Sequence, residues 1–162
     1  FEFANFLKDY YADITEALIK TKAEIYQYVG DEVVLSWPIR RGIEHQNAVT
    51  CFFEIKKLIA NKKEKYISKY GYVPEFRAGL HGGKVIVTWV GELKKEIVYV
   101  GDVLNTTARI QEDCKRLNKD FLISESLLNR MNALNLVKPT FEEETTPRGK
   151  EGRIKLYSLE QQ

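Results

Sequence analysis

Apolar side chains recur at helical spacing in two stretches of the first 65 residues, and two shorter stretches between them have the pattern of strands. Residues 4–22 carry an apolar stripe at every third or fourth position, which predicts a helix. Residues 24–29 and 32–37 flank a Gly-Asp pair, and this pattern predicts two strands joined by a hairpin turn. A longer amphipathic stretch predicts one continuous helix over residues 42–65.

The rest of the chain alternates between strand and helix patterns. The predicted strands lie at 76–81, 84–90, 96–100, 121–123, 135–142 and 153–159, and the predicted helices lie at 102–117 and from 124 to about 131. Tight turns join some of the strands, whereas helices separate others. The sequence therefore predicts an α+β fold, with helices packed on a central mixed or antiparallel sheet.

Composition limits the classes of function. A chain of 162 residues with 44% hydrophobic residues can form one domain with its own core. Its net charge of +2 is too small to indicate a nucleic-acid surface or a polybasic membrane patch. There is no apolar run of roughly 20 residues and no signal-peptide pattern. Cys51 and Cys114 lie far apart in no metal-like spacing, so we expect a reduced, cytoplasmic setting.

The segment from Tyr99 to Arg109 carries the most informative chemistry. It has the pattern of a strand end, a glycine turn and the first turns of a helix. Asn105 and Arg109 lie four residues apart, which places them on one face of that helix. An amide and a guanidinium arranged in this way suit the binding of a sugar and a phosphate. Asp31 adds a carboxylate at the predicted hairpin tip.

Four motifs come in the order and spacing of a known family. They are Tyr28-Val-Gly-Asp31, Phe76-Arg-Ala-Gly-Leu-His-Gly-Gly83, Val100-Gly-Asp-Val-Leu-Asn-Thr-Thr-Ala-Arg109 and Arg148-Gly-Lys150. Together they resemble the catalytic domain of bacterial-type class III adenylate/guanylate cyclases, and the resemblance covers nearly the whole of residues 1–162. It implies a ferredoxin-like core and a purine nucleotide cyclase that converts ATP to 3′,5′-cyclic AMP and pyrophosphate in intracellular signalling. It also implies two Mg²⁺ or Mn²⁺ ions per site and a head-to-tail homodimer with its sites at the interface.

The resemblance also assigns roles to individual residues. Asp31 matches a metal-binding aspartate, although a Gly-Asp pair alone indicates only a turn. Arg109 matches the arginine that stabilises the transition state, because a planar, permanently charged fork suits extra charge on phosphorus. Asn105 matches the residue that orients the ribose; without the resemblance, both would be ordinary polar residues of a helix. Lys150 matches a residue that contacts the triphosphate, and a solvated loop lysine is an equally good interpretation.

The chain departs from the family pattern at the metal site. The family's other metal aspartate lies on a strand upstream of the segment matched here. We therefore expect this chain, as written, to lack that first strand and a complete metal site. Asp9 and Asp13 lie inside the first predicted helix and are poor substitutes.

A second departure concerns the purine base. Gln27 stands where the family has a base-reading lysine, and Val98 stands where it has an aspartate or threonine. Gln27 can donate and accept hydrogen bonds at a purine edge, but Val98 cannot. Trp89, in a strand where the family often has small residues, could support a dimer contact or fill a pocket.

Three alternatives stay open at this point. The protein could be a guanylate cyclase, since adenine is favoured only by analogy with the commoner members. It could be a degenerate, non-catalytic module that binds a nucleotide or a partner chain. A diguanylate-cyclase-like relative is the weakest alternative, because the Gly-Gly-acidic-acidic-Phe hairpin is absent from the sequence.

Overall fold

The computed structural model describes residues 2–131, 134–135, 137–146 and 152–162. The chain divides into two compact units, residues 1–76 and residues 77–162, and each is described by itself. None of the described helices is both long and apolar enough to cross a bilayer.

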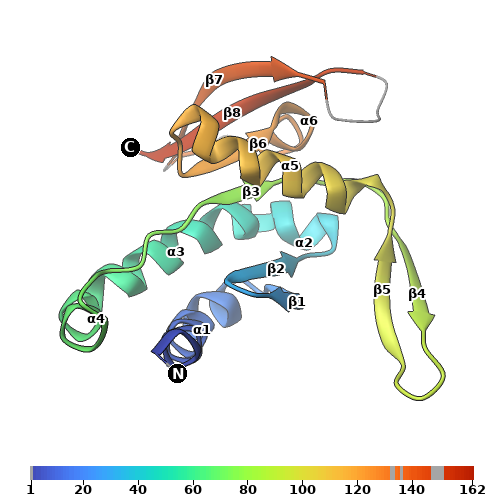
Figure 1. Cartoon of the computed structure of the whole chain (residues 1–162). Helices are drawn as coiled ribbons and strands as arrows, with labels where there is room; N and C mark the ends of the chain where they lie inside the picture. Colours follow the sequence, from blue (N-terminus) through green and yellow to red (C-terminus); the bar gives the residue numbers. More distant parts are fainter. Residues whose placement is uncertain (1, 132–133, 136, 147–151) are drawn as a thin grey trace. The chain divides into compact units, whose positions relative to one another are not determined.

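The first unit consists of helices around a small hairpin (Figure 1). Its elements are α1 (Glu2–Lys20), β1 (Glu24–Val29), β2 (Glu32–Ser36), α2 (Ile39–Ile43), a 3-10 turn (Glu44–Gln46), α3 (Asn47–Asn61) and α4 (Lys63–Tyr70). The strands β1 and β2 pair antiparallel, as predicted. Helices α1, α3 and α4 share one hydrophobic core, made by Ile14, Ala17, Leu18, Cys51, Ile55, Ile59 and Tyr66.

The prediction of a single helix over residues 42–65 is wrong. The helix is interrupted at His45 and Gln46, which have left-handed φ values of 51° and 58°, and a second break in the helix lies at Lys62. The first break separates α2 from α3, and the second separates α3 from α4. Because apolar residues continue at helical spacing across both breaks, periodicity alone does not reveal them.

The second unit is built on a four-stranded sheet. Its elements are β3 (Ala78–Leu80), β4 (Ile86–Val90), β5 (Glu96–Val100), α5 (Asp102–Leu117), β6 (Phe121–Ser124), α6 (Glu125–Leu128), β7 (Val137–Thr145) and β8 (Ile154–Gln161). The sheet order is β3-β6-β8-β7, with β3 and β6 parallel and the other neighbours antiparallel. This mixed sheet with helices confirms the predicted α+β class.

Helix α5 is fixed closely on this sheet. Its inner residues Ile110 and Cys114 pack with Leu122 of β6 and Leu156 of β8. Gly79 of β3 permits the close approach, because a Cβ atom at that position would lie 2.5 Å from the backbone nitrogen of Gln111. The sheet therefore sets the position of α5, which carries the predicted phosphate-binding residues.

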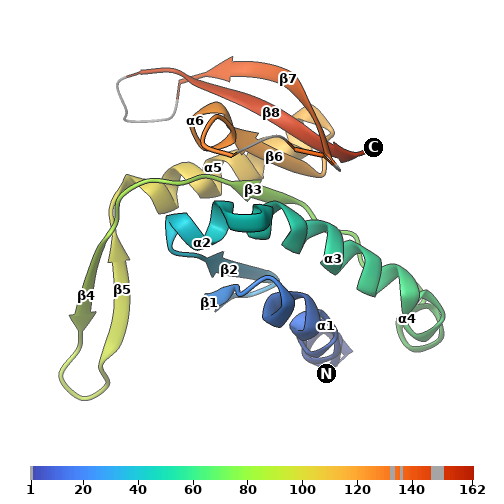
Figure 2. The ribbon, with the colours of Figure 1, turned by 180° about the vertical axis from the view of Figure 1, so that it is seen from behind.

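The strands β4 and β5 form a separate antiparallel hairpin that projects away from α5 and the four-stranded sheet (Figures 1 and 2). Apolar side chains on it are exposed to solvent, namely Ile86, Val87, Trp89, Val90, Leu93, Ile97 and Val100. A two-stranded ribbon with this much exposed apolar surface is unusual in a protein without a partner.

Candidate functional site

The turn between β5 and α5 is made by a glycine that no other residue could easily replace. Gly101 has a φ of 150°, and a Cβ atom there would lie 3.2 Å from the carbonyl oxygen of Lys84. Helix α5 begins at the next residue, Asp102, and runs to Leu117 as the sequence predicts. This turn fixes the direction in which the first turns of the helix leave the strand.

Asn105 and Arg109 lie on successive turns of α5, and both side chains are exposed. The guanidinium Nε of Arg109 lies 3.8 Å from Oδ1 of Asp113, one turn farther along the helix. The structure thus brings the amide and the guanidinium to one solvent-facing stretch of helix, as predicted. An exposed guanidinium beside an amide can contact a phosphate and a ribose of one ligand.

Val98 lies in β5, opposite Thr88 of β4. Its side chain is partly buried and offers no hydrogen-bonding group, as its residue type requires. Trp89 is opposite Ile97 and is 65% exposed, so it fills no cavity within this unit. Lys150 lies outside the described residues, and its predicted triphosphate contact stays a prediction.

Asp31 and Gln27 lie on the β1–β2 hairpin of the first unit. Gly30, with a φ of 58°, and Asp31 form the two-residue turn, and the side chain of Asp31 is exposed at its tip. Gln27 pairs with Val34 next to an irregularity in the strand pairing, and its side chain is also exposed. The structure therefore places both residues on one small hairpin, four residues apart.

Tyr11 of α1 supports the tip of this hairpin, a role that the sequence did not reveal. Its hydroxyl donates a 3.2 Å hydrogen bond to the carbonyl oxygen of Gly30, and its ring packs on Tyr28 with centroids 4.4 Å apart. Burial raises the pKa of Tyr11, and the negative charges of Asp31 and Glu32 add to this effect. The hydroxyl therefore stays protonated and keeps its donor role at neutral pH.

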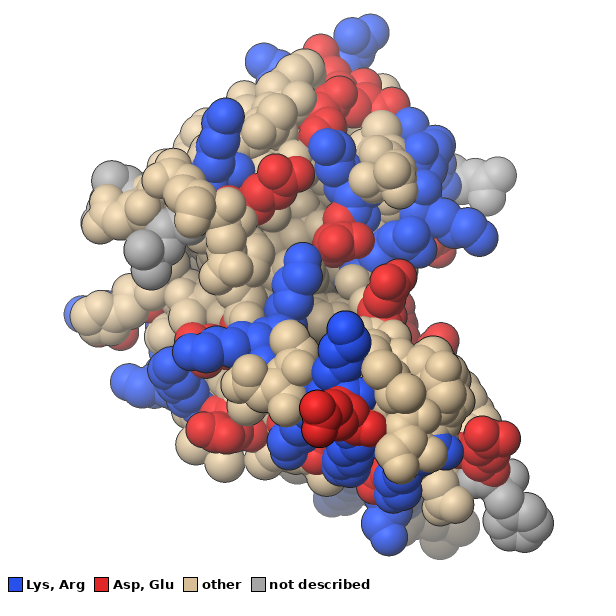
Figure 3. All heavy atoms as spheres, turned by 90° about the vertical axis from the view of Figure 1, so that its left-hand side faces the viewer, with Lys and Arg blue, Asp and Glu red and all other residues tan. Residues whose placement is uncertain are grey.

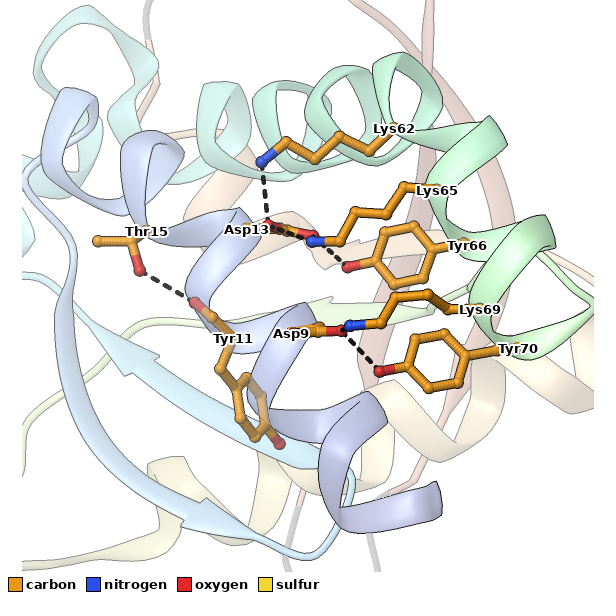
Figure 4. A network of polar contacts seen from close by, with 9 residues as sticks. All are labelled: Asp9, Tyr11, Asp13, Thr15, Lys62, Lys65, Tyr66, Lys69 and Tyr70. Carbon is orange, nitrogen blue, oxygen red and sulfur yellow. Dashed lines mark hydrogen bonds and ion pairs between the residues drawn. The ribbon is translucent and has the colours of Figure 1, made fainter. Parts of the chain in front are cut away.

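Two carboxylates of α1 face lysine and tyrosine side chains of the α3–α4 region (Figure 4). Asp13 accepts hydrogen bonds from Lys62, Lys65 and Tyr66 at 2.9, 2.9 and 2.7 Å. Asp9, one turn earlier, accepts 2.6 Å bonds from Lys69 and Tyr70.

The pKa values of both carboxyls follow from these contacts. Hydrogen bonds from Lys69 and Tyr70 lower the pKa of Asp9 to about 2. Burial alone would raise the pKa of Asp13, but hydrogen bonds from Tyr66 and the two lysines outweigh it and lower the pKa. Both carboxylates are thus engaged by cations of the chain itself, which agrees with the expectation that they are poor metal ligands.

Comparison with known proteins decides the family. The family model of the adenylate and guanylate cyclase catalytic domain matches residues 1–161. The chain belongs to this cyclase family. It is 32% identical over 154 residues to adenylate cyclase 2 of Rhizobium meliloti (strain 1021). The match covers 95% of the chain but only 42% of that relative.

Solved cyclase structures share the fold. A bacterial light-regulated adenylyl cyclase matches 98% of the chain and 45% of its own, with a TM-score of 0.78 at 17% identity. The adenylyl cyclase CyaB from P. aeruginosa matches 98% of the chain and 82% of its own, with a TM-score of 0.77 at 16% identity. The guanylyl cyclase Cya2 gives a TM-score of 0.75 at 17% identity. These likenesses confirm the predicted cyclase fold.

The family resemblance implies a metal site with Asp31 as one ligand. Among the described residues, no group of three or more His, Cys, Asp or Glu side chains is placed to hold a metal ion. Mg²⁺ is often held by only one or two carboxylates and completes its shell with water and substrate phosphates. An exposed aspartate at a hairpin tip fits that role, so Asp31 stays our prediction for one ligand. These residues alone do not form a site prepared for two ions.

The charged surface agrees with the small net charge of the cyclase chain. Figure 3 shows lysine and arginine side chains interspersed with aspartate and glutamate over one face.

Proposed function

We propose that this chain is the catalytic domain of a purine nucleotide cyclase, which converts ATP to 3′,5′-cyclic AMP and pyrophosphate. One observation carries the proposal. Asn105 and Arg109 are exposed on successive turns at the start of α5, directly after the Gly101 turn, in a chain that matches the cyclase family over residues 1–161. We propose that residues 1–162 act as one such domain.

The chemistry follows from what these two side chains can bind. The ribose 3′-oxygen attacks the α-phosphorus and loses its proton, while the bond to the bridging oxygen of pyrophosphate breaks. Negative charge on the phosphoryl oxygens is best stabilised by a guanidinium, and we assign this role to Arg109. Asn105 would hold the ribose so that its 3′-oxygen lies in line with the breaking bond.

The proposal also includes a divalent metal ion, with the carboxylate of Asp31 as one of its ligands. Mg²⁺ or Mn²⁺ at this carboxylate would neutralise triphosphate charge and favour ionisation of the attacking hydroxyl. The presence of two ions per site stays a prediction from the family resemblance. Two ions would need more ligands than the described residues bring together.

We also propose a head-to-tail homodimer as the working state. The exposed apolar side chains of the β4–β5 hairpin support it, because an apolar ribbon of this kind is stabilised by covering it with another protein surface. Trp89 and Ile97, which face each other across the hairpin, would lie in that contact.

ATP is the proposed substrate, and GTP is the alternative. The match to an adenylate cyclase of R. meliloti supports ATP. Gln27 is the described residue on the β1–β2 hairpin that could read a purine edge, since its amide both donates and accepts. The side chain of Val98 has no hydrogen-bonding group for either base. A cytoplasmic setting is also proposed, supported by the two cysteines, which are free and buried.

The proposal is tested on the full-length protein. ATP or GTP is supplied with Mg²⁺ or Mn²⁺, and cyclic nucleotide is separated by chromatography. We expect cyclic AMP from the wild type, a loss of about 100-fold or more in Arg109→Ala, and little change in Lys115→Ala, an exposed cation on the same helix. Nucleotide binding without any product, unchanged in Arg109→Ala, would instead identify a non-catalytic module.

A further inference from the structure

Asp113 is a buried carboxylate on α5, next to the arginine that we assign to catalysis. Its side chain is 6% exposed, whereas that of Arg109 is 50% exposed. Oδ1 lies 3.8 Å from Nε of Arg109 and 3.2 Å from a terminal nitrogen of Arg116. One oxygen of Asp113 therefore faces two guanidinium groups of the same helix.

The other oxygen of Asp113 has no hydrogen-bonding partner among the described residues. Oδ2 is buried and accepts no hydrogen bond from any described residue. A buried carboxylate with an unsatisfied oxygen is costly, so a folded protein retains one only where its charge is compensated or used. The adjacent cations are the groups that compensate it here.

Arg116 cannot turn fully toward Asp113, because it is already engaged elsewhere. Its two terminal nitrogens contact the two carboxylate oxygens of Glu143 on β7, one of them at 2.9 Å. Hydrogen bonds between the two groups raise the pKa of Arg116 and lower the pKa of Glu143, so both stay charged. Arg116 is thus anchored to the sheet, and Arg109 is the cation at Asp113 that can still move.

The attachment point on Arg109 is also informative. Asp113 faces the Nε atom, which leaves the two terminal amino groups of the guanidinium available to phosphate oxygens. At 3.8 Å the contact is an ion pair and not a hydrogen bond, so it restrains the side chain without fixing it. A restraint of this kind reduces the number of rotamers among which an exposed arginine is distributed.

We propose that Asp113 is a positioning residue, which holds Arg109 along α5 so that its terminal amino groups point toward the triphosphate. This inference rests on the proposed function, because it assigns Asp113 a role through Arg109. It predicts a kinetic effect at the transition state and not at substrate binding, since Arg109 acts on charge that develops during the reaction.

The test compares Asp113→Asn with Glu112→Gln in the full-length protein. Both changes replace an acid by its amide on α5, but Glu112 is exposed and faces solvent. We expect Asp113→Asn to lower kcat by about 10- to 100-fold with KM within about twofold, because misplacing a catalytic group by an ångström has effects of this size. Glu112→Gln should keep wild-type values. In an Arg109→Ala background, Asp113→Asn should change kcat by less than about twofold.

A second measurement does not depend on turnover. The ¹⁵N relaxation of the Arg109 Nε–H bond reports how far that side chain is restrained on the ps–ns timescale. We expect a higher order parameter than for the exposed Arg40 in the wild type, and a fall to the Arg40 value in Asp113→Asn. If the wild type makes no cyclic nucleotide, the proposed function fails while this measurement still tests the restraint.

Three results would overturn the inference. The first is equal mobility of Arg109 and Arg40 in the wild type. The second is an Asp113→Asn variant with unchanged or increased kcat, which would mean that Asp113 keeps Arg109 away from the substrate or does not restrain it. The third is an effect of Asp113→Asn that persists in the Arg109→Ala background, which would indicate a structural role only.

Discussion

Replacing Asp13 by alanine tests how α1 is held in the first unit. The substitution removes the acceptor of three hydrogen bonds, from Lys62, Lys65 and Tyr66. The two lysines are 40% and 38% exposed and can turn to water, but Tyr66 is fully buried. The tyrosine hydroxyl would therefore lose its partner inside the core.

The magnitude follows from these different exposures. A buried hydroxyl left without a partner costs about 1–3 kcal/mol. Each partly exposed lysine contact adds at most about 0.5 kcal/mol after solvent screening. We therefore expect Asp13→Ala to lower the free energy of unfolding by about 1–4 kcal/mol. For a chain of this length, each kcal/mol corresponds to about 2–4 °C in Tm.

Urea unfolding followed by circular dichroism measures the change through the transition midpoint at constant slope. The decisive comparison is Asp13→Ala against the double variant Asp13→Ala/Tyr66→Phe. Because the phenylalanine leaves no unpaired hydroxyl, the double variant should be at least as stable as Asp13→Ala alone. A loss below about 1 kcal/mol in Asp13→Ala, or a further loss in the double variant, would refute this reasoning.

Four more expectations concern other parts of the fold. Tyr11→Phe removes the hydrogen bond to the hairpin tip, and it should weaken metal-dependent turnover several-fold while leaving the free energy of unfolding within about 1 kcal/mol of wild type. Gly79→Ala forces β3 and α5 apart, and it should cost about 1–3 kcal/mol in urea unfolding, against no loss for an alanine at an exposed loop position. Trp89→Glu should shift the protein toward monomer in sedimentation and reduce turnover together with dimer content; an unchanged dimer would contradict the role of the hairpin. The folded pKa values of Asp9 and Asp13 both lie below the unfolded value of 3.8, so their stabilisation is present above about pH 4 and is lost at lower pH, for Asp9 as the pH falls through about 2. The double asparagine variant should therefore show a flatter decline of the urea midpoint below about pH 4.

The strongest local patterns in the sequence predicted their elements well. The bounds of α5 agree with the prediction residue for residue, because a glycine precedes it and its apolar positions are regular. The β1–β2 hairpin was equally clear from its two-residue turn. Positive φ values at His45 and Gln46 were not predictable, since neither residue type demands that conformation.

The placement of Asn105 and Arg109 on one face of α5 was predictable from their spacing, whereas the roles assigned to them come from the family resemblance and stay predictions. Tyr11 lies within the helix predicted over residues 4–22, and only the fold shows that its hydroxyl reaches Gly30, 19 residues away. Asp113 did carry a signal, because it lies one helical turn after Arg109, but its burial and its unpaired oxygen depend on the sheet beneath α5.

The paired carboxylates of α1 have a consequence for how that helix can slide. The order of the contacts shows that α1 and α4 run in opposite directions, with Asp9 and Asp13 each facing one lysine–tyrosine pair. A slide of one turn, about 5.4 Å, would let one aspartate meet the other's partners and leave its neighbour unpaired. With one aspartate alone, α1 could form nearly equivalent contacts at two positions along its axis, whereas the two aspartates together favour one position. Since Tyr11 lies between Asp9 and Asp13 in the sequence, the two aspartates also fix the position along the helix axis at which Tyr11 supports the hairpin tip and the carboxylate of Asp31.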